Sequence, residues 1–460
     1  MNFDIRWLYA IIVFIIGAVI FSFSRKKEIF LIRILVFLMP FAIGFYYMVV
    51  SGKDDAVYAC DVMLFFLYLY WFWETNGFKS QRIYYDKILL LYLALIIWAL
   101  FPVGFVVSQS SLLFAVFTWI KCFFLFFYIT NRIKSKEQLW IIIDVLLIAL
   151  LFQGLVGSFQ KISGRTLGLS FLGERQRVFL RASHGRARGT LGFPNQYAAY
   201  MIMIMPLAVT MFIYSKKGLK KLWYLVILIA SSIGWITSLS RSGWLGMAGA
   251  LVVIFFLMNK AAQVNLKAFF LLVFGILIIS FLVFIFGEQV LSRVQNVGTQ
   301  QYRMLMIRMS LDMTAANPIF GVGLWNYQFH SFGDFRYWHA VHNMFLRFAA
   351  ETGIPGFLLF MAIIYNSFKN CIQSLRFRDR FLNYTALGIM GGQLAFIIAA
   401  MFNPQYQHYR HKFLFWFLIG LGIAVKRIGL HEKFIAYKKR KEKILNEKNR
   451  EDVGYLDINQ

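Results

Sequence analysis

The residues best suited to chemistry are a histidine and a set of arginines. Nine residues separate His342-Asn343 from the sequence GIPG at 353–356. An imidazole titrates near neutral pH, so His342 could act as a general base. His339 and Glu351 fall near the same face of a helix drawn through this stretch, and either could orient the imidazole. A lone histidine is more often structural, so the catalytic interpretation depends on charged groups gathering around it.

Arginines crowd two long polar connections and one short turn. They are Arg165, Arg175, Arg177, Arg181, Arg186 and Arg188 in 159–194, Arg241 in the turn Ser240-Arg241-Ser242, and Arg293, Arg303, Arg308 and Arg336 in 287–340. The guanidinium fork matches phosphate oxygens bidentately. We therefore expect an anionic headgroup, above all a diphosphate, with ordinary anionic phospholipid as the alternative ligand.

The elements that must position these groups are membrane-spanning helices. The chain has 460 residues, of which 60% are hydrophobic, whereas soluble domains hold about 45–50%. The excess falls in blocks of roughly 17–25 residues, the length of helix that spans a bilayer. The sequence predicts an all-α polytopic bundle of about 12–13 spans. They lie near 7–23, 29–50, 56–73, 88–107, 112–130, 139–158, 195–214, 221–239, 242–258, 267–286, 341–365, 382–402 and 411–426.

The formal net charge of +27 lies mainly in short connections and in the tail after Lys426. This is the positive-inside pattern, which favours the lipid bilayer over nucleic acid as the partner. It puts the N-terminus outside, the C-terminus inside, and both arginine-rich connections, 159–194 and 287–340, on the outer face of a plasma membrane. We divide the chain into N-terminal helices (1–150), a catalytic membrane region (151–425) and a basic cytoplasmic tail (426–460).

Several smaller expectations follow from local patterns. One face of an amphipathic helix that could lie in the membrane interface is shared by Met304, Ile307, Leu311 and Ala315. Asn195 should cap the helix after Pro194. Aromatic residues of the outer connection are expected in the interfacial belt; they are Trp325, Tyr327 and Trp338.

Two kinds of cofactor site are missing from the sequence. It has no Walker-type loop, and the outer connections hold no HExxH or DxD motif. Their few acidic residues make a metal site improbable. We therefore expect neither a metal nor another cofactor.

Four stretches together resemble the O-antigen ligase/polymerase superfamily of bacterial membrane glycosyltransferases. They are RARGTLGFPNQYAAYM (186–201), SRSGWLG (240–246), YRMLMIRMSLDMTAANPIFGVGLWNY (302–327) and HAVHNMFLRFAAETGIPGF (339–357). The resemblance covers roughly 150–425, and the last stretch is the most specific. Family ligases often carry a polar residue after the final glycine, whereas this chain continues Phe357-Leu358-Leu359.

The resemblance implies transfer of a glycan from a polyprenyl diphosphate, such as undecaprenyl diphosphate, to a hydroxyl of an acceptor glycan outside the plasma membrane. It implies roles for His342 as the base and for Arg241 and Arg303 as stabilisers of the leaving diphosphate. Substrate-binding roles extend to a second set, which comprises Arg186, Arg188, Arg308, His339 and Glu351. Other polysaccharide assembly proteins are candidate partners.

Three alternatives stay open at this point. A composition rich in Phe, Ile and Lys indicates an AT-rich genome, as in many Gram-positive bacteria. It therefore favours a capsule, exopolysaccharide or teichuronic-type polymerase over a ligase that attaches glycan to a lipid core or protein. A flippase or transporter would use charges within spans, namely Asp61, Lys121 and Asp144, although Lys121 and Asp144 could simply pair. A non-catalytic scaffold for envelope assembly would tolerate changes at His342.

Overall fold

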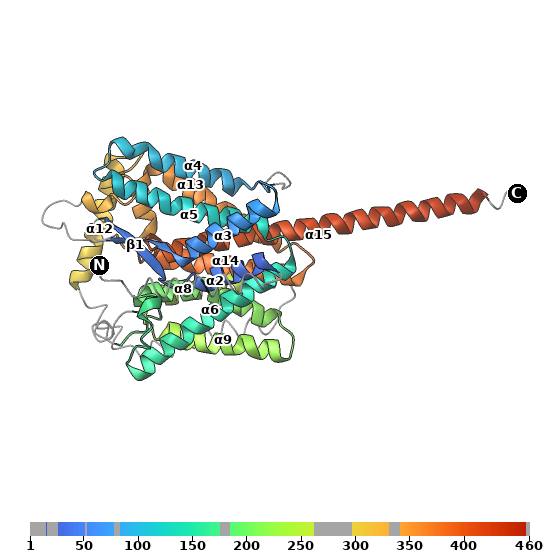
Figure 1. The fold of residues 1–460 in the computed structure, drawn as a ribbon, viewed down its shortest axis with the longest axis horizontal. Coiled ribbons are helices and arrows are strands. Elements are labelled where there is room, and N and C mark those ends of the chain that lie inside the picture. Colours follow the sequence, from blue (N-terminus) through green and yellow to red (C-terminus); the bar gives the residue numbers. More distant parts are fainter. Residues whose placement is uncertain are drawn as a thin grey trace.

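The computed structural model describes residues 15, 26–50, 53–77, 83–174, 185–261, 297–330 and 341–456. Its long helices run side by side as one bundle, from which the last helix projects (Figure 1). Within the described residues, nine helical segments are long and apolar enough to cross a membrane. They are α4 (Lys87–Leu100, continued by η1, Phe101–Gly104), α5 (Gln109–Arg132), α6 (Lys136–Ser163), α8 (Pro194–Tyr214), α9 (Leu219–Ile236), α10 (Arg241–Ala261), α13 (Met344–Ser374), α14 (Arg380–Ala400) and α15 (Tyr409–Leu456). The predicted all-α bundle is confirmed.

The N-terminal region departs from the predicted spans. The expected span 29–50 is wrong, because α2 (Lys27–Leu38) has 12 residues, which is too short to cross about 30 Å of hydrocarbon. Strand β1 (Gly44–Val50) follows and pairs antiparallel with β2 (Lys53–Tyr58); aromatic and β-branched residues in GFYYMVV favour a strand. Helix α3 (Ala59–Glu74) completes the region. The expected spans 7–23 and 267–286 lie outside the described residues, apart from residue 15.

The core forms where small residues let helices approach closely. Helix α8 is buried along most of its length and packs against α14 and α10. A Cβ on Gly392 of α14 would lie 2.0 Å from the carbonyl oxygen of Met203, and one on Gly246 of α10 would lie 2.3 Å from that of Ala395. Small residues at such crossings are how membrane helices gain van der Waals contact.

The connections gather at two ends of the bundle. We call the first the loop end; it holds 101–108, 185–193, 237–241, 317–330 and 401–408. Hydrogen bonds join these segments, including Ala187 N to Thr237 O (3.0 Å) and Ser108 N to Asn326 Oδ1 (2.7 Å). We call the opposite end the tail end, because α15 leaves the bundle there (Figure 1). The predicted alternation of connections between two faces agrees with this arrangement.

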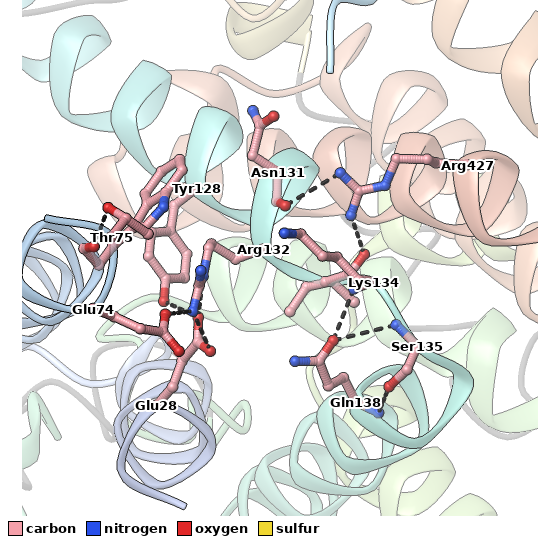
Figure 2. A network of polar contacts seen from close by, with 12 residues as sticks. Glu28, Glu74, Thr75, Tyr128, Asn131, Arg132, Lys134, Ser135, Gln138 and Arg427 are labelled. Carbon is pink, nitrogen blue, oxygen red and sulfur yellow. Dashed lines mark hydrogen bonds and ion pairs between the residues drawn. The ribbon is translucent and has the colours of Figure 1, made fainter. Parts of the chain in front are cut away.

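The tail end is held by buried ion pairs and carbonyl caps (Figure 2). The Arg132 side chain, 6% exposed, pairs with Glu28 of α2 through Nη2 (2.7 Å) and also with Glu74 of α3. Arg427 of α15 donates to the carbonyl oxygens of Asn131 (3.2 Å) and Ile133 (2.6 Å). Arg132 and Arg427 therefore fasten four helices together, and the structure accounts for the charge of both without a substrate.

Candidate functional site

Arg241 lies at the loop end, at the first position of α10. The turn before it is fastened by Arg186, whose Nε donates to the carbonyl oxygen of Ser238 (2.7 Å) and whose Nη2 donates to that of Leu239 (3.2 Å). Leu239 adopts a left-handed conformation with φ 51°, which a bulky residue rarely does. A helix N-terminus presents backbone N–H groups and the positive end of its dipole to anions. Arg241 is exposed there, so guanidinium and helix terminus can act on one ligand.

Arg303 brings a second guanidinium to the same place. It lies on α12 (Val297–Ala316) and is half-buried. Burial lowers the pKa of Arg303, and the nearby positive charge of Arg241 lowers it further. Its Nε is buried and finds no acceptor among the described residues. Within that part of the chain, neither arginine has a carboxylate within ion-pair distance. Among the described residues, the pair therefore forms a cationic site without a counter-anion.

His342 lies directly before α13 and half-buried. Asn343 caps the helix by accepting hydrogen bonds from the backbone N–H groups of Phe345 (2.9 Å) and Leu346 (3.1 Å). On the other side, fully buried Val341 belongs to a cluster with Met306 and Met309 of α12. His342 is therefore anchored between the helix that carries Arg303 and the start of α13.

The first glycine of the GIPG sequence, Gly353, forms a kink in α13. It interrupts α13 with φ 69° and ψ −178°, and the kink lets Ile354 N donate to the carbonyl oxygen of Pro318 (2.8 Å). Two further hydrogen bonds, Val322 N to Ala350 O (2.8 Å) and Gly323 N to Glu351 O (3.0 Å), dock the segment after α12 onto α13. The kink thus holds α12, and with it Arg303, against the helix that follows His342.

Replacing Gly353 with alanine should destabilise the protein. The added Cβ would lie 2.1 Å from the carbonyl oxygen of Ile319, and the positive φ disfavours any side chain. We expect a loss of about 1–3 kcal/mol or more, measured by thermal unfolding of the purified protein in detergent. Gly104→Ala is the control, because a Cβ there meets nothing within 4 Å. Equal unfolding temperatures for the two variants would show that the kink is dispensable.

A pocket opens at the loop end between α5, α13 and α15. Its charged residues are Arg347, Glu351 and Lys412. Arg347 Nε and Nη2 each lie 2.8 Å from Glu351 Oε1, and both side chains are 7% exposed. Lys412 is 2% exposed, and its ammonium lies 5.4 Å from the centre of the Trp325 ring. Glu351 therefore forms an ion pair with Arg347. Its predicted role in orienting His342 stays a prediction.

Lys121 pairs with Asp61, so the expected pairing of Lys121 with Asp144 is wrong. Lys121 Nζ lies 2.9 Å from Asp61 Oδ2, and the side chains are 14% and 10% exposed. Asp61 also accepts from the hydroxyl of Tyr409. Asp144 instead lies near Lys220 and Arg33. Lys121 lies against Asp61 of α3 and not against Asp144 of α6. Comparing the depths of charged residues on consecutive spans could therefore not identify the ion-pair partner of Lys121.

Removing Lys121 alone should therefore harm folding. Lys121→Met leaves the buried Asp61 carboxylate without its cation, and we expect a loss of about 3–5 kcal/mol. The double variant Lys121→Met/Asp61→Asn should recover much of it, because the amide can still accept from Tyr409. Thermal unfolding in detergent measures both. A single variant as stable as wild type would contradict a structural role and reopen the transport alternative.

Other predicted residues have mixed outcomes. Asn195 does not cap α8, whose N-cap is Phe193; it accepts from Arg186 Nη2 (3.0 Å) instead. Tyr327 is buried and its hydroxyl lies 2.8 Å from Ser310 Oγ, so the belt assignment is wrong for it. Arg188 is buried at 5% exposure, and Arg308 is exposed.

Some predicted residues lie outside the described part of the chain. His339 is the substrate-binding candidate among them. The others are Arg175, Arg177, Arg181, Arg293, Arg336 and Trp338. Among the described residues, no group of three or more His, Cys, Asp or Glu side chains could hold a metal ion.

Sequence reasoning missed Arg347, Gln407 and Lys412. Signals for two of them were available. Lys412 stands at the start of an apolar run, and an ionisable residue inside a span is a functional candidate by default. Arg347 and Glu351 have the i, i+4 spacing of a helical ion pair. Gln407 carried no comparable signal.

Comparison with known families agrees with these features. Residues 225–361 match a family model described as O-antigen ligase. The match includes Arg241, Arg303 and His342, together with the kink at Gly353. A search of curated proteins found no match.

Proposed function

We propose that the chain is a membrane glycosyltransferase of the O-antigen ligase/polymerase superfamily and that it polymerises a cell-surface polysaccharide from polyprenyl-diphosphate-linked repeat units outside the bacterial plasma membrane. The family match over residues 225–361 and the nine helical segments that are long and apolar enough to span a membrane support the class. One observation supports this most strongly. Arg241 and Arg303 lie close enough to repel one another at the N-terminus of α10, without a carboxylate partner in the described residues. A diphosphate at a membrane surface supplies the missing charge.

The proposed reaction gives each of these residues one role. The hydroxyl oxygen of the acceptor sugar attacks the anomeric carbon of the donor, and the bond from that carbon to the diphosphate oxygen breaks. His342 takes the hydroxyl proton as general base. Arg241 and Arg303 stabilise the negative charge that develops on the leaving diphosphate. Arg186 acts through the turn before α10 and is a positioning residue.

The acceptor decides between the two members of this class. A polymerase adds repeat units to a growing chain, whereas a ligase attaches the glycan to a lipid core or protein. The Phe-, Ile- and Lys-rich composition and the apolar continuation after the GIPG sequence support the polymerase. A transporter is less well supported, because Lys121 and Asp61 form a buried pair with a structural explanation.

Deletion of the gene tests the proposal. Envelope glycans are compared in the deletion strain, in a wild-type complement and in an Arg241→Gln complement. We expect single repeat units on the lipid carrier in the deletion strain and in the Arg241→Gln strain, and full-length polymer in the wild-type complement. Full-length polymer left on its carrier would indicate the ligase instead. Unchanged glycans in the deletion strain would overturn both.

A further inference from the structure

The pocket at the loop end is lined by charged, amide and aromatic side chains. We call it the lysine pocket and define it by Trp119, Trp325, Arg347, Glu351, Gln407 and Lys412. It is distinct from the turn that carries Arg241, and it forms where the N-terminal parts of α5, α13 and α15 meet the segment after α12. All of these elements lie at the loop end, so the pocket is on the same side of the bundle as the arginine pair.

Two hydrogen-bond donors in this pocket have no acceptor among the described residues. Lys412 is 2% exposed, and among the described residues its ammonium contacts the ring of Trp325 but no oxygen acceptor. The Nε2 atom of Gln407 is buried and likewise without a partner in that part of the chain. Buried polar groups are normally hydrogen-bonded, and an exception calls for an explanation such as a missing ligand. Both donors line one pocket, so one ligand could satisfy both.

The charges of the pocket select the sign of that ligand. Arg347 and Glu351 neutralise each other across 2.8 Å. Among the described residues that line the pocket, the buried Lys412 then leaves a surplus of one positive charge. A buried cation without a counter-ion is costly, and an anion with one negative charge removes the cost. A diphosphate carries more charge than this pocket can balance, and it fits the arginine pair better.

The aromatic residues that line the pocket indicate which kind of molecule bears the anionic group. Trp119 and Trp325 both line the pocket, and aromatic rings offer large, rigid apolar faces that suit the C–H face of a pyranose. Trp325 adopts φ 58°, a conformation that costs energy for a bulky residue and that clusters at ligand sites. The fold therefore holds this ring in the pocket at some expense.

We propose that the lysine pocket binds an acidic sugar residue of the glycan, whose carboxylate accepts hydrogen bonds from Lys412 and Gln407 while its ring lies against Trp325. The proposal rests on the proposed function, because it assumes a glycan substrate. It adds that the polymer contains a hexuronate or another carboxylated sugar. An uncharged sugar could accept hydrogen bonds from both donors but would leave the positive charge of Lys412 uncompensated.

Ligand-observed NMR on the full chain in detergent tests this inference. Methyl glucuronide and methyl glucoside have the same ring and differ in the carboxylate. We expect wild type to bind the glucuronide at least about tenfold more tightly, because a site built for a polar group rejects the analogue that lacks it. Lys412→Met should reduce glucuronide binding to the level of the glucoside. The control is Lys369→Met, because Lys369 is an exposed lysine at the tail end. This variant should bind both sugars as wild type does.

Two results would overturn the proposal. One is equal binding of glucuronide and glucoside by wild type, which needs no variant and does not depend on the folding of Lys412→Met. The other comes from a competition experiment in which pyrophosphate is added to Arg241→Gln protein that already holds the glucuronide. If pyrophosphate displaces the glucuronide at a concentration below that of the glucuronide, the pocket binds phosphate more tightly and would be reassigned to the carrier phosphate. Failure of the proposed function is distinguishable, since it would appear as unchanged envelope glycans on gene deletion while glucuronide selectivity persists.

Discussion

Replacing His342 with alanine should lower the rate of glycan transfer by roughly two to four orders of magnitude, the usual contribution of a general base. The acceptor hydroxyl would then have to lose its proton to water. Asn343 still caps α13 in this variant, so the protein should fold and insert normally. The measurement is polymer formation in the deletion strain, normalised to the amount of variant protein in the membrane fraction.

His431→Ala is the matched control, because His431 is an exposed histidine on the part of α15 that leaves the tail end. It should support wild-type polymer. Full polymer formation by His342→Ala would exclude a catalytic role and favour the scaffold alternative.

Replacing Arg303 with alanine should reduce transfer roughly a hundred- to a thousandfold, as does removal of one preorganised donor from a charged transition state. Arg303→Lys should recover only part of this, because an ammonium cannot bind two phosphate oxygens with a planar fork. Removing the repulsion between Arg303 and Arg241 should leave the fold intact or slightly more stable. Polymer formation and thermal unfolding together separate the two effects.

Arg378→Ala is the control for this series, since Arg378 is an exposed arginine at the tail end. It removes the same charge without touching the loop end. A similar loss from Arg378→Ala would show that net charge, and not the arginine pair, governs activity.

The long apolar helices were predictable because hydrophobic length is the dominant signal for a membrane span. Helix α6, for example, begins and ends within a turn or so of the predicted 139–158. Prediction failed where another signal competed. At 29–50 the run is apolar apart from Arg33. Its second half, however, is aromatic and β-branched and pairs with β2, which begins with the charged residues Lys53-Asp54-Asp55. Apolar length alone could not separate these states.

The site was predictable in its residue types and less so in its partners. The sequence order of Arg186, Arg241, Arg303 and His342 carried the resemblance, and the loop end collects all four. The use of Arg186 as a clamp on the turn before α10 was not visible, because its carbonyl acceptors lie more than fifty residues away. Glu351 was offered as one of two residues that could orient His342, but it pairs with Arg347 one helical turn away. That partner could have been found from the i, i+4 spacing.

Native mass spectrometry of the purified chain with undecaprenyl diphosphate tests the central claim most directly. The arginine pair predicts that wild type retains the diphosphate and that Arg241→Gln/Arg303→Gln loses it, while both proteins bind undecaprenyl monophosphate weakly. Equal retention of the diphosphate by wild type and the double variant would contradict the claim that these two guanidinium groups hold the carrier.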